Sequence, residues 1–169
     1  SRLPGRTQQI ISRLRDCQVL YFSPARSPRD KSYRKGGRKV RPNVTACTLP
    51  PILFPISERY QRLFQMAWNK IGRFIQEEAA RRRFTEPLLW TTQPHHVHLV
   101  DRLEYSALVY DCDRVWDSPP AHWEGSLAQA ADVVFAASPL LRERLSPCSS
   151  NIALLPNGFT LPLFDAAAR

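Results

Sequence analysis

The order of apolar and polar positions along the chain follows two different periods. Short, continuously apolar runs predict strands, and they lie between segments whose apolar residues recur at helical spacing. Helices are predicted over 6–16, 57–84, 122–132 and 139–145, with a short helix or turn over 96–103. Strands are predicted over 18–24, 44–48, 87–94, 107–112, 133–138 and 151–156. Because most of these strands are apolar throughout, they are expected to be buried on both faces, as in a parallel sheet.

Alternation of strands and helices predicts a doubly wound α/β domain, with a mostly parallel sheet and helices on both faces. We expect residues 1–158 to form this one Rossmann-like domain. In the longest predicted helix, Ser57 is the expected N-cap, and the apolar stripe runs from Tyr60 and Leu63 to Ile75. Such a domain normally opens on a strand, and this chain opens on a helix, so its first strand is expected to be missing.

The charge of the chain is strongly positive, with a formal net charge of +9 over 169 residues. Residues 26–41 contain eight basic residues and one acid, and they lack apolar periodicity. This pattern predicts an inserted basic loop over 26–42. One interpretation is a solvated loop, with the arginines at 81–83 favoured at a helix C-terminus. The other is contact with phosphate groups or an anionic membrane surface. The residues expected to make that contact are Arg34, Lys35, Arg38 and Lys39.

Polar residues follow the ends of the predicted strands, where open α/β sheets bind their ligands. Asp111 and Asp113 are the main candidates, because a carboxylate at a strand end can accept a hydroxyl proton. The alternative is that each caps a helix or stabilises a turn. The same edge is expected to carry Gln93, His95, His96, Ser138, Asn157 and Gly158. Glu124 and Asp132 flank a predicted helix, and caps or solvated charges are the favoured interpretation for both.

Several other kinds of site have little support in the sequence. His95, His96 and His98 with Cys112 could be metal ligands, but the H-H-x-H spacing lacks the i, i+4 pairing of a helical site, and we expect no metal. The chain contains no glycine-rich phosphate-binding motif and no nucleophile elbow. No apolar run approaches the ~20 residues of a membrane span. The four cysteines are widely spaced and predict free thiols in a reducing compartment.

Three segments, ALVYDCDRVWD, WEGSLAQAADVVFAASPLLRERL and NIALLPNGFTLPLF, resemble the N-terminal half of GT-B glycosyltransferases. The similarity is to the group 1/family 4-like enzymes, including the branch that acts in teichuronic acid biosynthesis. The matching positions are Tyr110, Asp111, Asp113, Glu124, Ala131, Asp132, Ser138, Leu141, Leu155, Pro156, Asn157, Gly158 and Phe164. Residues 3–24 resemble the first helix and second strand of the family, including its R-x-Q motif. The chain departs from the family where YDCDRVWD replaces Y-D-x-x-D-D, and where the acid after the glycine is lost.

The resemblance implies an acceptor-binding half whose nucleotide-diphosphate sugar donor is bound mainly by a second, C-terminal domain. Residues 159–169 would then begin the linker to that domain, with Asn157 and Gly158 at the hinge. Asp111 and Asp113 would be catalytic, and Gln93, His95, His96 and Ser138 would bind the acceptor. No cofactor is implied in this domain. The implied acceptor is a glycan or a lipid-linked glycan of cell-surface polysaccharide synthesis, and the implied location is cytoplasmic and peripheral at the inner membrane face.

Other classes of function remain open at this point. A nucleic-acid-binding module is compatible with the basicity, but only Tyr33 is interleaved as a stacking aromatic, and no nucleic acid is expected. A non-catalytic Rossmann-like module that binds sugar or lipid phosphate is the main alternative. A sugar epimerase of GT-B fold is the third. The resemblance also suggests that the sugar is transferred with retention, and that this half alone is inactive.

Overall fold

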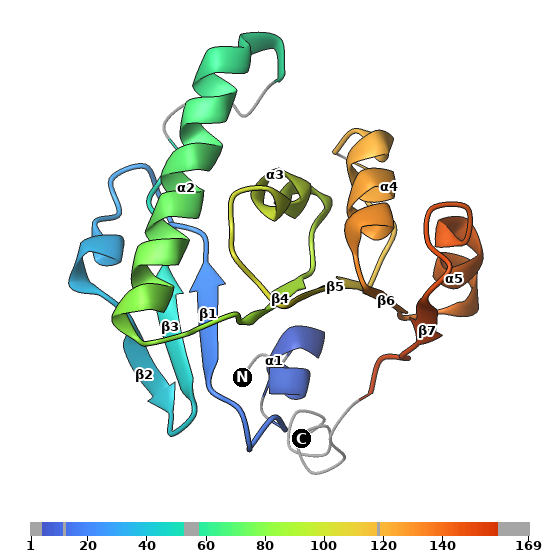
Figure 1. Cartoon of the computed structure of the whole chain (residues 1–169), viewed down its shortest axis with the longest axis horizontal. Coiled ribbons are helices and arrows are strands. Elements are labelled where there is room, and N and C mark those ends of the chain that lie inside the picture. Colours follow the sequence, from blue (N-terminus) through green and yellow to red (C-terminus); the bar gives the residue numbers. More distant parts are fainter. Residues whose placement is uncertain (1–4, 12, 53–57, 118, 159–169) are drawn as a thin grey trace, which may run out of the picture. The chain divides into compact units, whose positions relative to one another are not determined.

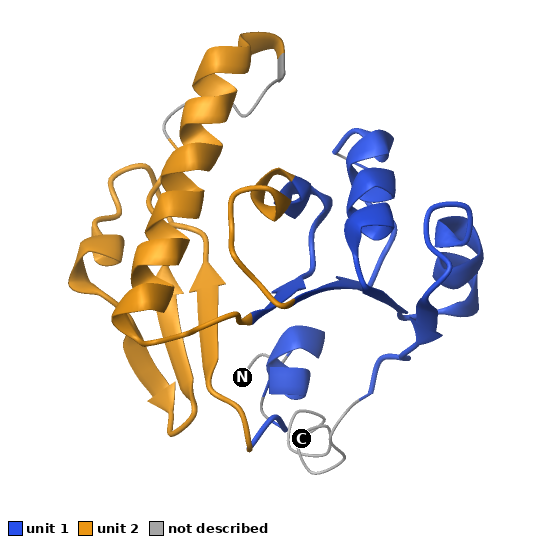
Figure 2. Ribbon diagram, in the orientation of Figure 1, with its two compact units in different colours: residues 1–15, 88–97, 107–169 blue, residues 16–87, 98–106 orange. Residues whose placement is uncertain are grey.

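The structure is a computed structural model that describes residues 5–11, 13–52, 58–117 and 119–158. The expected cap Ser57, the expected linker 159–169 and the family-matched Phe164 lie outside these residues. The chain divides into two compact units (Figure 2). Unit 1 comprises residues 1–15, 88–97 and 107–169, and unit 2 comprises residues 16–87 and 98–106.

Unit 1 is built on a four-stranded sheet in which all neighbouring strands are parallel (Figure 1). The strands are β4 (Leu88–Thr91), β5 (Ala107–Cys112), β6 (Val133–Ala136) and β7 (Ile152–Leu154), in that spatial order. The register places Tyr110 opposite both Thr91 and Val134. The central strand β5 is almost entirely buried, as its continuous apolar run predicts.

Helices cover both faces of this sheet, which confirms the predicted α/β class. The helices of unit 1 are α1 (Arg6–Ile11), α4 (Ala121–Ala130) and α5 (Pro139–Leu145), and the short helix η3 (Pro94–His96) follows β4. Asp111 bonds to a residue of α1, whereas its neighbour Tyr110 bonds to α4. Since successive side chains of a strand point to opposite faces, α1 and α4 lie on opposite sides of the sheet. The core on the α4 side is centred on Leu108, Leu127 and Val134, which are fully buried.

Unit 2 contains a three-stranded sheet in the order β1 (Val19–Ser23), β3 (Val44–Thr48), β2 (Arg38–Arg41). β1 is parallel to β3, and β2 is antiparallel to it. The expectation of a continuous basic loop was therefore wrong, because residues 38–41 form an exposed edge strand, and a short helix η1 (Ser32–Lys35) precedes it. Charged residues protect an edge strand from pairing with other chains. A strand made of such residues lacks the apolar alternation from which a strand is predicted in a sequence.

The long helix of unit 2 is α2 (Gln61–Arg81), preceded by the short helix η2 (Glu58–Tyr60). α3 (Val97–Val100) follows η3 along the chain. The predicted apolar stripe of α2 is confirmed at Phe64, Trp68 and Ile71, which are buried. The first two positions of the predicted stripe are not buried, because Tyr60 is 54% exposed and Leu63 is 39% exposed. The buried face therefore begins one turn later than the apolar pattern predicts.

Candidate functional site

The candidate site lies at the carboxyl edge of the unit 1 sheet. Because β4 to β7 are parallel and in register, Thr91, Cys112, Ala136 and Leu154 end their strands at the same edge. Asp111 lies near the end of β5, and the segments that leave this edge contain the other residues of unit 1 that the sequence nominated. Polar side chains that are distant in sequence are thus brought to one edge of the fold, where α/β proteins bind ligands.

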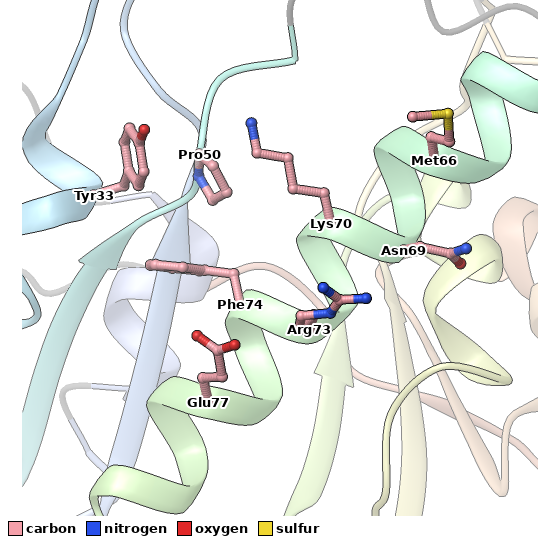
Figure 3. Close-up of a pocket in the computed structure, with 8 residues that line it drawn as sticks. All are labelled: Tyr33, Pro50, Met66, Asn69, Lys70, Arg73, Phe74 and Glu77. Atoms are coloured by element: carbon pink, nitrogen blue, oxygen red, sulfur yellow. The ribbon is translucent and has the colours of Figure 1, made fainter.

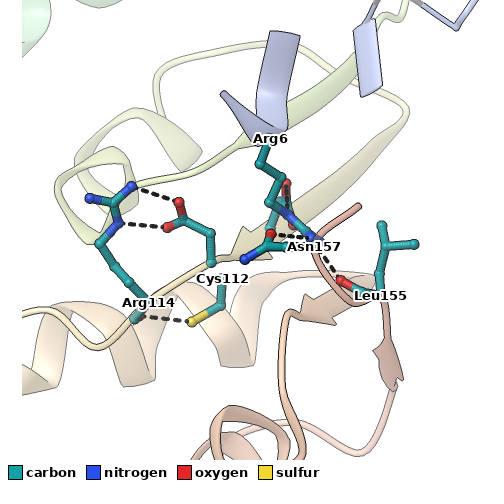
Figure 4. A network of polar contacts seen from close by, with 7 residues as sticks. Arg6, Cys112, Arg114, Leu155 and Asn157 are labelled. Carbon is teal, nitrogen blue, oxygen red and sulfur yellow. Dashed lines mark hydrogen bonds and ion pairs between the residues drawn. The ribbon is translucent and has the colours of Figure 1, made fainter. Parts of the chain in front are cut away.

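Asp111 takes part in a buried ion pair with Arg6 of α1 (Figure 4). The Nε of Arg6 donates to Oδ1 and Oδ2 of Asp111 at 2.9 and 3.1 Å, and its Nη2 donates to Oδ1 at 2.7 Å. The Nη1 of Arg6 donates to the carbonyl oxygen of Leu155 at 2.7 Å and to Oδ1 of Asn157 at 3.0 Å. A single guanidinium therefore joins α1, the end of β5 and the segment that follows β7.

This geometry limits what Asp111 can do directly. Its side chain is 1% exposed, and that of Arg6 is 9% exposed. Both carboxylate oxygens already accept hydrogen bonds from a charged donor, which is the strong, directional kind of bond. In this arrangement Asp111 orients Arg6, and it does not face solvent. Sequence reasoning gave Arg6 no role, although Arg6 is the arginine of the R-x-Q motif.

Asp113 is the more accessible carboxylate at this edge. Its side chain is 22% exposed, and it forms a two-point pair with the neighbouring Arg114, whose Nε and Nη2 donate at 3.0 and 2.7 Å. The guanidinium of Arg114 also lies over the ring of Trp116, 5.4 Å from its centroid. Hydrogen bonding to Asp113 raises the pKa of Arg114.

Two neutral histidines follow β4 at the same edge. Pro94 occupies the first turn of η3 and is buried, which holds His95 and His96 close to the end of the strand. The ring of His95 meets Trp123 edge-on at 5.3 Å, and within the described residues its buried Nδ1 has no hydrogen-bond partner. Burial lowers the pKa of His95, and burial together with His95 lowers the pKa of His96 to about 4.

The remaining nominated residues differ in their surroundings. Ser138 is the N-cap of α5, where its hydroxyl accepts a hydrogen bond from the backbone N–H of Leu141 at 3.3 Å. Gln93 is exposed, directly before η3. Gly158 is exposed, at the last described position. Arg34, Lys35, Arg38 and Lys39 belong to unit 2, on η1 and β2, and all four are exposed.

A second polar cluster on the opposite face of β5 was not predicted. Glu124 of α4 accepts hydrogen bonds from Tyr110 Oη at 2.7 Å and from Arg144 of α5 at 2.6 and 2.8 Å. The thiol of Cys112 lies 3.5 Å from the same carboxylate. Glu124 is only 4% exposed, so its interpretation as a cap or solvated charge was wrong. Asp132 is exposed, and its carboxylate accepts a hydrogen bond from the backbone N–H of Leu108 at 2.7 Å.

No family model matches the chain, and no curated protein matches it. Its structure is similar to that of a sucrose-phosphate synthase from Thermosynechococcus elongatus. The TM-score is 0.59 at 16% sequence identity, and the match covers 89% of this chain and 82% of that chain. The chain has the Rossmann-like α/β fold of a GT-B half. The identity is too low for the similarity to indicate more than the fold.

Two properties of the described residues bear on other functions. They contain no group of three or more histidine, cysteine, aspartate or glutamate side chains arranged to hold a metal ion. None of the described helices has both the length and the apolar character needed to cross a membrane.

Proposed function

We propose that the chain is the acceptor-binding half of a glycosyltransferase. The reaction would move a sugar from a nucleotide-diphosphate sugar to a glycan or lipid-linked acceptor of cell-surface polysaccharide synthesis, as in the teichuronic acid branch. The observation that carries the proposal is the edge of the unit 1 sheet. There an accessible carboxylate, Asp113, lies beside a buried ion pair that also holds the segment leaving β7.

Asp113 is assigned the direct role in this proposal. A partly exposed carboxylate at a strand end can accept the proton of an acceptor hydroxyl or orient it for attack. Because burial lowers the pKa of both His95 and His96, each ring favours the neutral form, in which one nitrogen can accept a hydrogen bond from an acceptor hydroxyl. Gln93 and Ser138 complete the polar lining that we assign to the acceptor.

Asp111 is assigned a positioning role. Through Arg6 it holds Leu155 and Asn157, and the resemblance makes Asn157 and Gly158 the hinge toward a donor-binding domain. The segment that leads to the hinge must be held in a fixed orientation if the donor sugar is to reach the acceptor hydroxyl. The second domain would bind the donor, and positive charge there would stabilise the leaving diphosphate.

The location that we propose is the cytoplasmic face of the membrane. Exposed cations on η1 and on the edge strand β2, namely Arg34, Lys35, Arg38 and Lys39, would attract anionic headgroups. Sugar transfer with retention is part of the proposal through the resemblance.

The test is donor turnover by the protein at its natural full length, with UDP-, GDP- and dTDP-sugars and a lipid-linked glycan acceptor. Asp113→Asn should lower kcat by about a hundredfold or more, because it removes a proton acceptor from the reacting hydroxyl. The control is Asp117→Asn, which removes a more exposed carboxylate four positions along and should leave kcat unchanged. Full activity of Asp113→Asn contradicts the assigned role.

A non-catalytic binding module is the second candidate. It is favoured by one observation, namely that both oxygens of Asp111 are occupied by Arg6 and that its side chain is closed to solvent. If the full-length protein consumes no donor while its unit 1 binds a glycan, this second function replaces the first.

A further inference from the structure

An open groove of about 410 Å³ lies in unit 2, along one side of α2 (Figure 3). Its lining includes Lys70, Arg73, Phe74 and Glu77 of α2, with Tyr33 of η1 and Pro50 after β3 opposite them. The four helix residues recur at intervals of three and four, so they share one face of α2. The groove belongs to unit 2, whereas the candidate acceptor site belongs to unit 1.

One wall of the groove is apolar and fixed in place. The ring of Phe74 meets Tyr33 edge-on at 6.3 Å and Phe22 edge-on at 6.4 Å. Pro50, a third residue of this wall, is buried. Because Phe74 is held from two sides, the wall needs little reordering when a ligand packs against it.

The other wall carries positive charge that the protein does not neutralise. Lys70 and Arg73 are exposed, and neither makes an ion pair with any described residue. Glu77, the acid in the lining, lies 3.7 Å from Arg81, which also pairs with the buried Glu78. The pKa of Tyr33 is lowered by its hydrogen bond from Arg34 and also by the nearby charges of Lys70 and Lys31. Two cations, Lys70 and Arg73, thus line one partly apolar groove.

We propose that this groove binds a small organic phosphate. The phosphate would lie between Lys70 and Arg73, which supply the charge-assisted hydrogen bonds that phosphates require. The organic part would pack on the wall of Tyr33, Pro50 and Phe74. The volume falls in the range of about 300–1,000 Å³ that is usual for small-molecule sites. The binding does not depend on the glycosyltransferase proposal, because it needs neither the sheet edge of unit 1 nor a donor.

The test is calorimetric titration of the whole chain with phenyl phosphate, and separately with inorganic phosphate. Wild-type protein should bind phenyl phosphate saturably, and Lys70→Gln/Arg73→Gln should weaken that binding by about tenfold or more. The charge-matched control, Arg62→Gln/Arg142→Gln, removes two exposed cations outside the groove and should keep wild-type affinity. Tyr33→Leu should weaken phenyl phosphate binding but not inorganic phosphate binding, because only the ring of the ligand uses the wall.

Three results would overturn the proposal. The first is the absence of saturable binding by the wild-type chain. The second is equal loss of affinity in the groove variant and in the charge-matched control, which would mean binding to net charge alone. The third is sedimentation with phosphatidylglycerol vesicles without any binding of phenyl phosphate, which would assign the groove to a membrane surface. Circular dichroism of each variant separates these results from unfolding.

Discussion

Two carboxylate–arginine pairs lie on opposite faces of the unit 1 sheet, on either side of β5. On one face, Glu124 pairs with Arg144, and on the other, Asp111 pairs with Arg6. The two carboxylate side chains are almost equally buried, at 5% and 1% exposed. The two pairs differ in their other contacts. The Glu124–Arg144 pair also contacts Tyr110 and Cys112 of the core, whereas the Asp111–Arg6 pair reaches Leu155 and Asn157 beyond the sheet.

The directions of the pKa shifts in the Glu124 cluster are those expected of a structural cluster. Burial raises the pKa of Glu124, but hydrogen bonds from Arg144 and Tyr110 outweigh this effect and leave it below its usual value. Burial raises the pKa of Tyr110, and it raises that of Cys112 to about 11. Near pH 7 no proton is poised to move, so the cluster fixes α4 and α5 against the sheet. Burial of a carboxylate therefore does not by itself mark a candidate site; the Asp111 pair differs because Arg6 also reaches Leu155 and Asn157.

The largest effect is expected from Arg144→Leu. The change leaves Glu124 charged and buried without its cation, and breaking such a pair from one side costs about 3 kcal/mol of unfolding free energy. Urea denaturation of the chain measures the loss. Arg142→Leu, at an exposed position on the same helix, should change stability by less than about 0.5 kcal/mol.

A double variant sharpens this first prediction. Glu124→Leu/Arg144→Leu removes both charges, and an apolar replacement of a buried pair is often close to neutral. The double variant should therefore recover much of the stability that Arg144→Leu loses. If Arg144→Leu alone costs under about 1 kcal/mol, the view of this cluster as a structural clamp is wrong.

The second prediction separates the two aspartates of the candidate site. Asp111→Ala should lower the unfolding free energy by about 2 kcal/mol, because it leaves the guanidinium of Arg6 buried without its carboxylate. Asp113→Ala should cost less than about 1 kcal/mol, since its pair with Arg114 is largely exposed. Transfer activity should show the opposite order at equal folded fraction. Equal effects of both variants on stability and on turnover would remove the distinction between positioning and direct roles.

Local signals explain why some elements were predicted to the residue. The predicted strand 107–112 and helix 139–145 match β5 and α5 at both ends. β5 is a continuous apolar run, and α5 has Ser138 as its cap and Pro139 in its first turn, so each boundary is set by adjacent residues. Such signals do not require knowledge of the tertiary structure.

The missed features all depend on partners that are distant in sequence. Arg6 and Asp111 are 105 positions apart, and Glu124 and Arg144 are 20 apart, so no local pattern links them. β2 consists of exposed basic residues, and its pairing with β3 defines it as a strand. The sequence therefore placed Asp111 and Asp113 at the end of the strand that the structure shows, but it did not reveal that Asp111 is the buried one of the two.

The third prediction uses pH to distinguish the ligand edge from the Glu124 cluster. His96 has a folded pKa of about 4, below the usual 6.5, so the neutral form is favoured in the fold. Its contribution to stability is fully present above pH 6.5 and is lost as pH falls toward 4. The pKa of Glu124 is lowered from 4.5, so its contribution is present above that pH and is lost as the carboxylate protonates below it.

Denaturation curves recorded across this pH range test the assignment. His96→Gln should flatten the upper part of the profile, between pH 6.5 and 4, although His95 contributes in the same direction and leaves a residual slope. Glu124→Gln should flatten only the part below pH 4.5. A wild-type profile that is level from pH 6.5 to 4 would contradict the burial of His96 in solution.

The smallest effect is expected from Asn157→Ala, which tests how far the Asp111 pair extends. Only one exposed hydrogen bond to Arg6 is lost, so the unfolding free energy should fall by about 0.5 kcal/mol. The backbone N–H of Leu155 bonds to the carbonyl oxygen of Ala136 at 2.9 Å, and its hydrogen exchange reports on the segment locally. That amide should exchange faster in the variant while the amides of β5 do not change. Unaltered exchange would mean that Arg6 holds this segment through the carbonyl of Leu155 alone, and that Asn157 is free to act in the hinge.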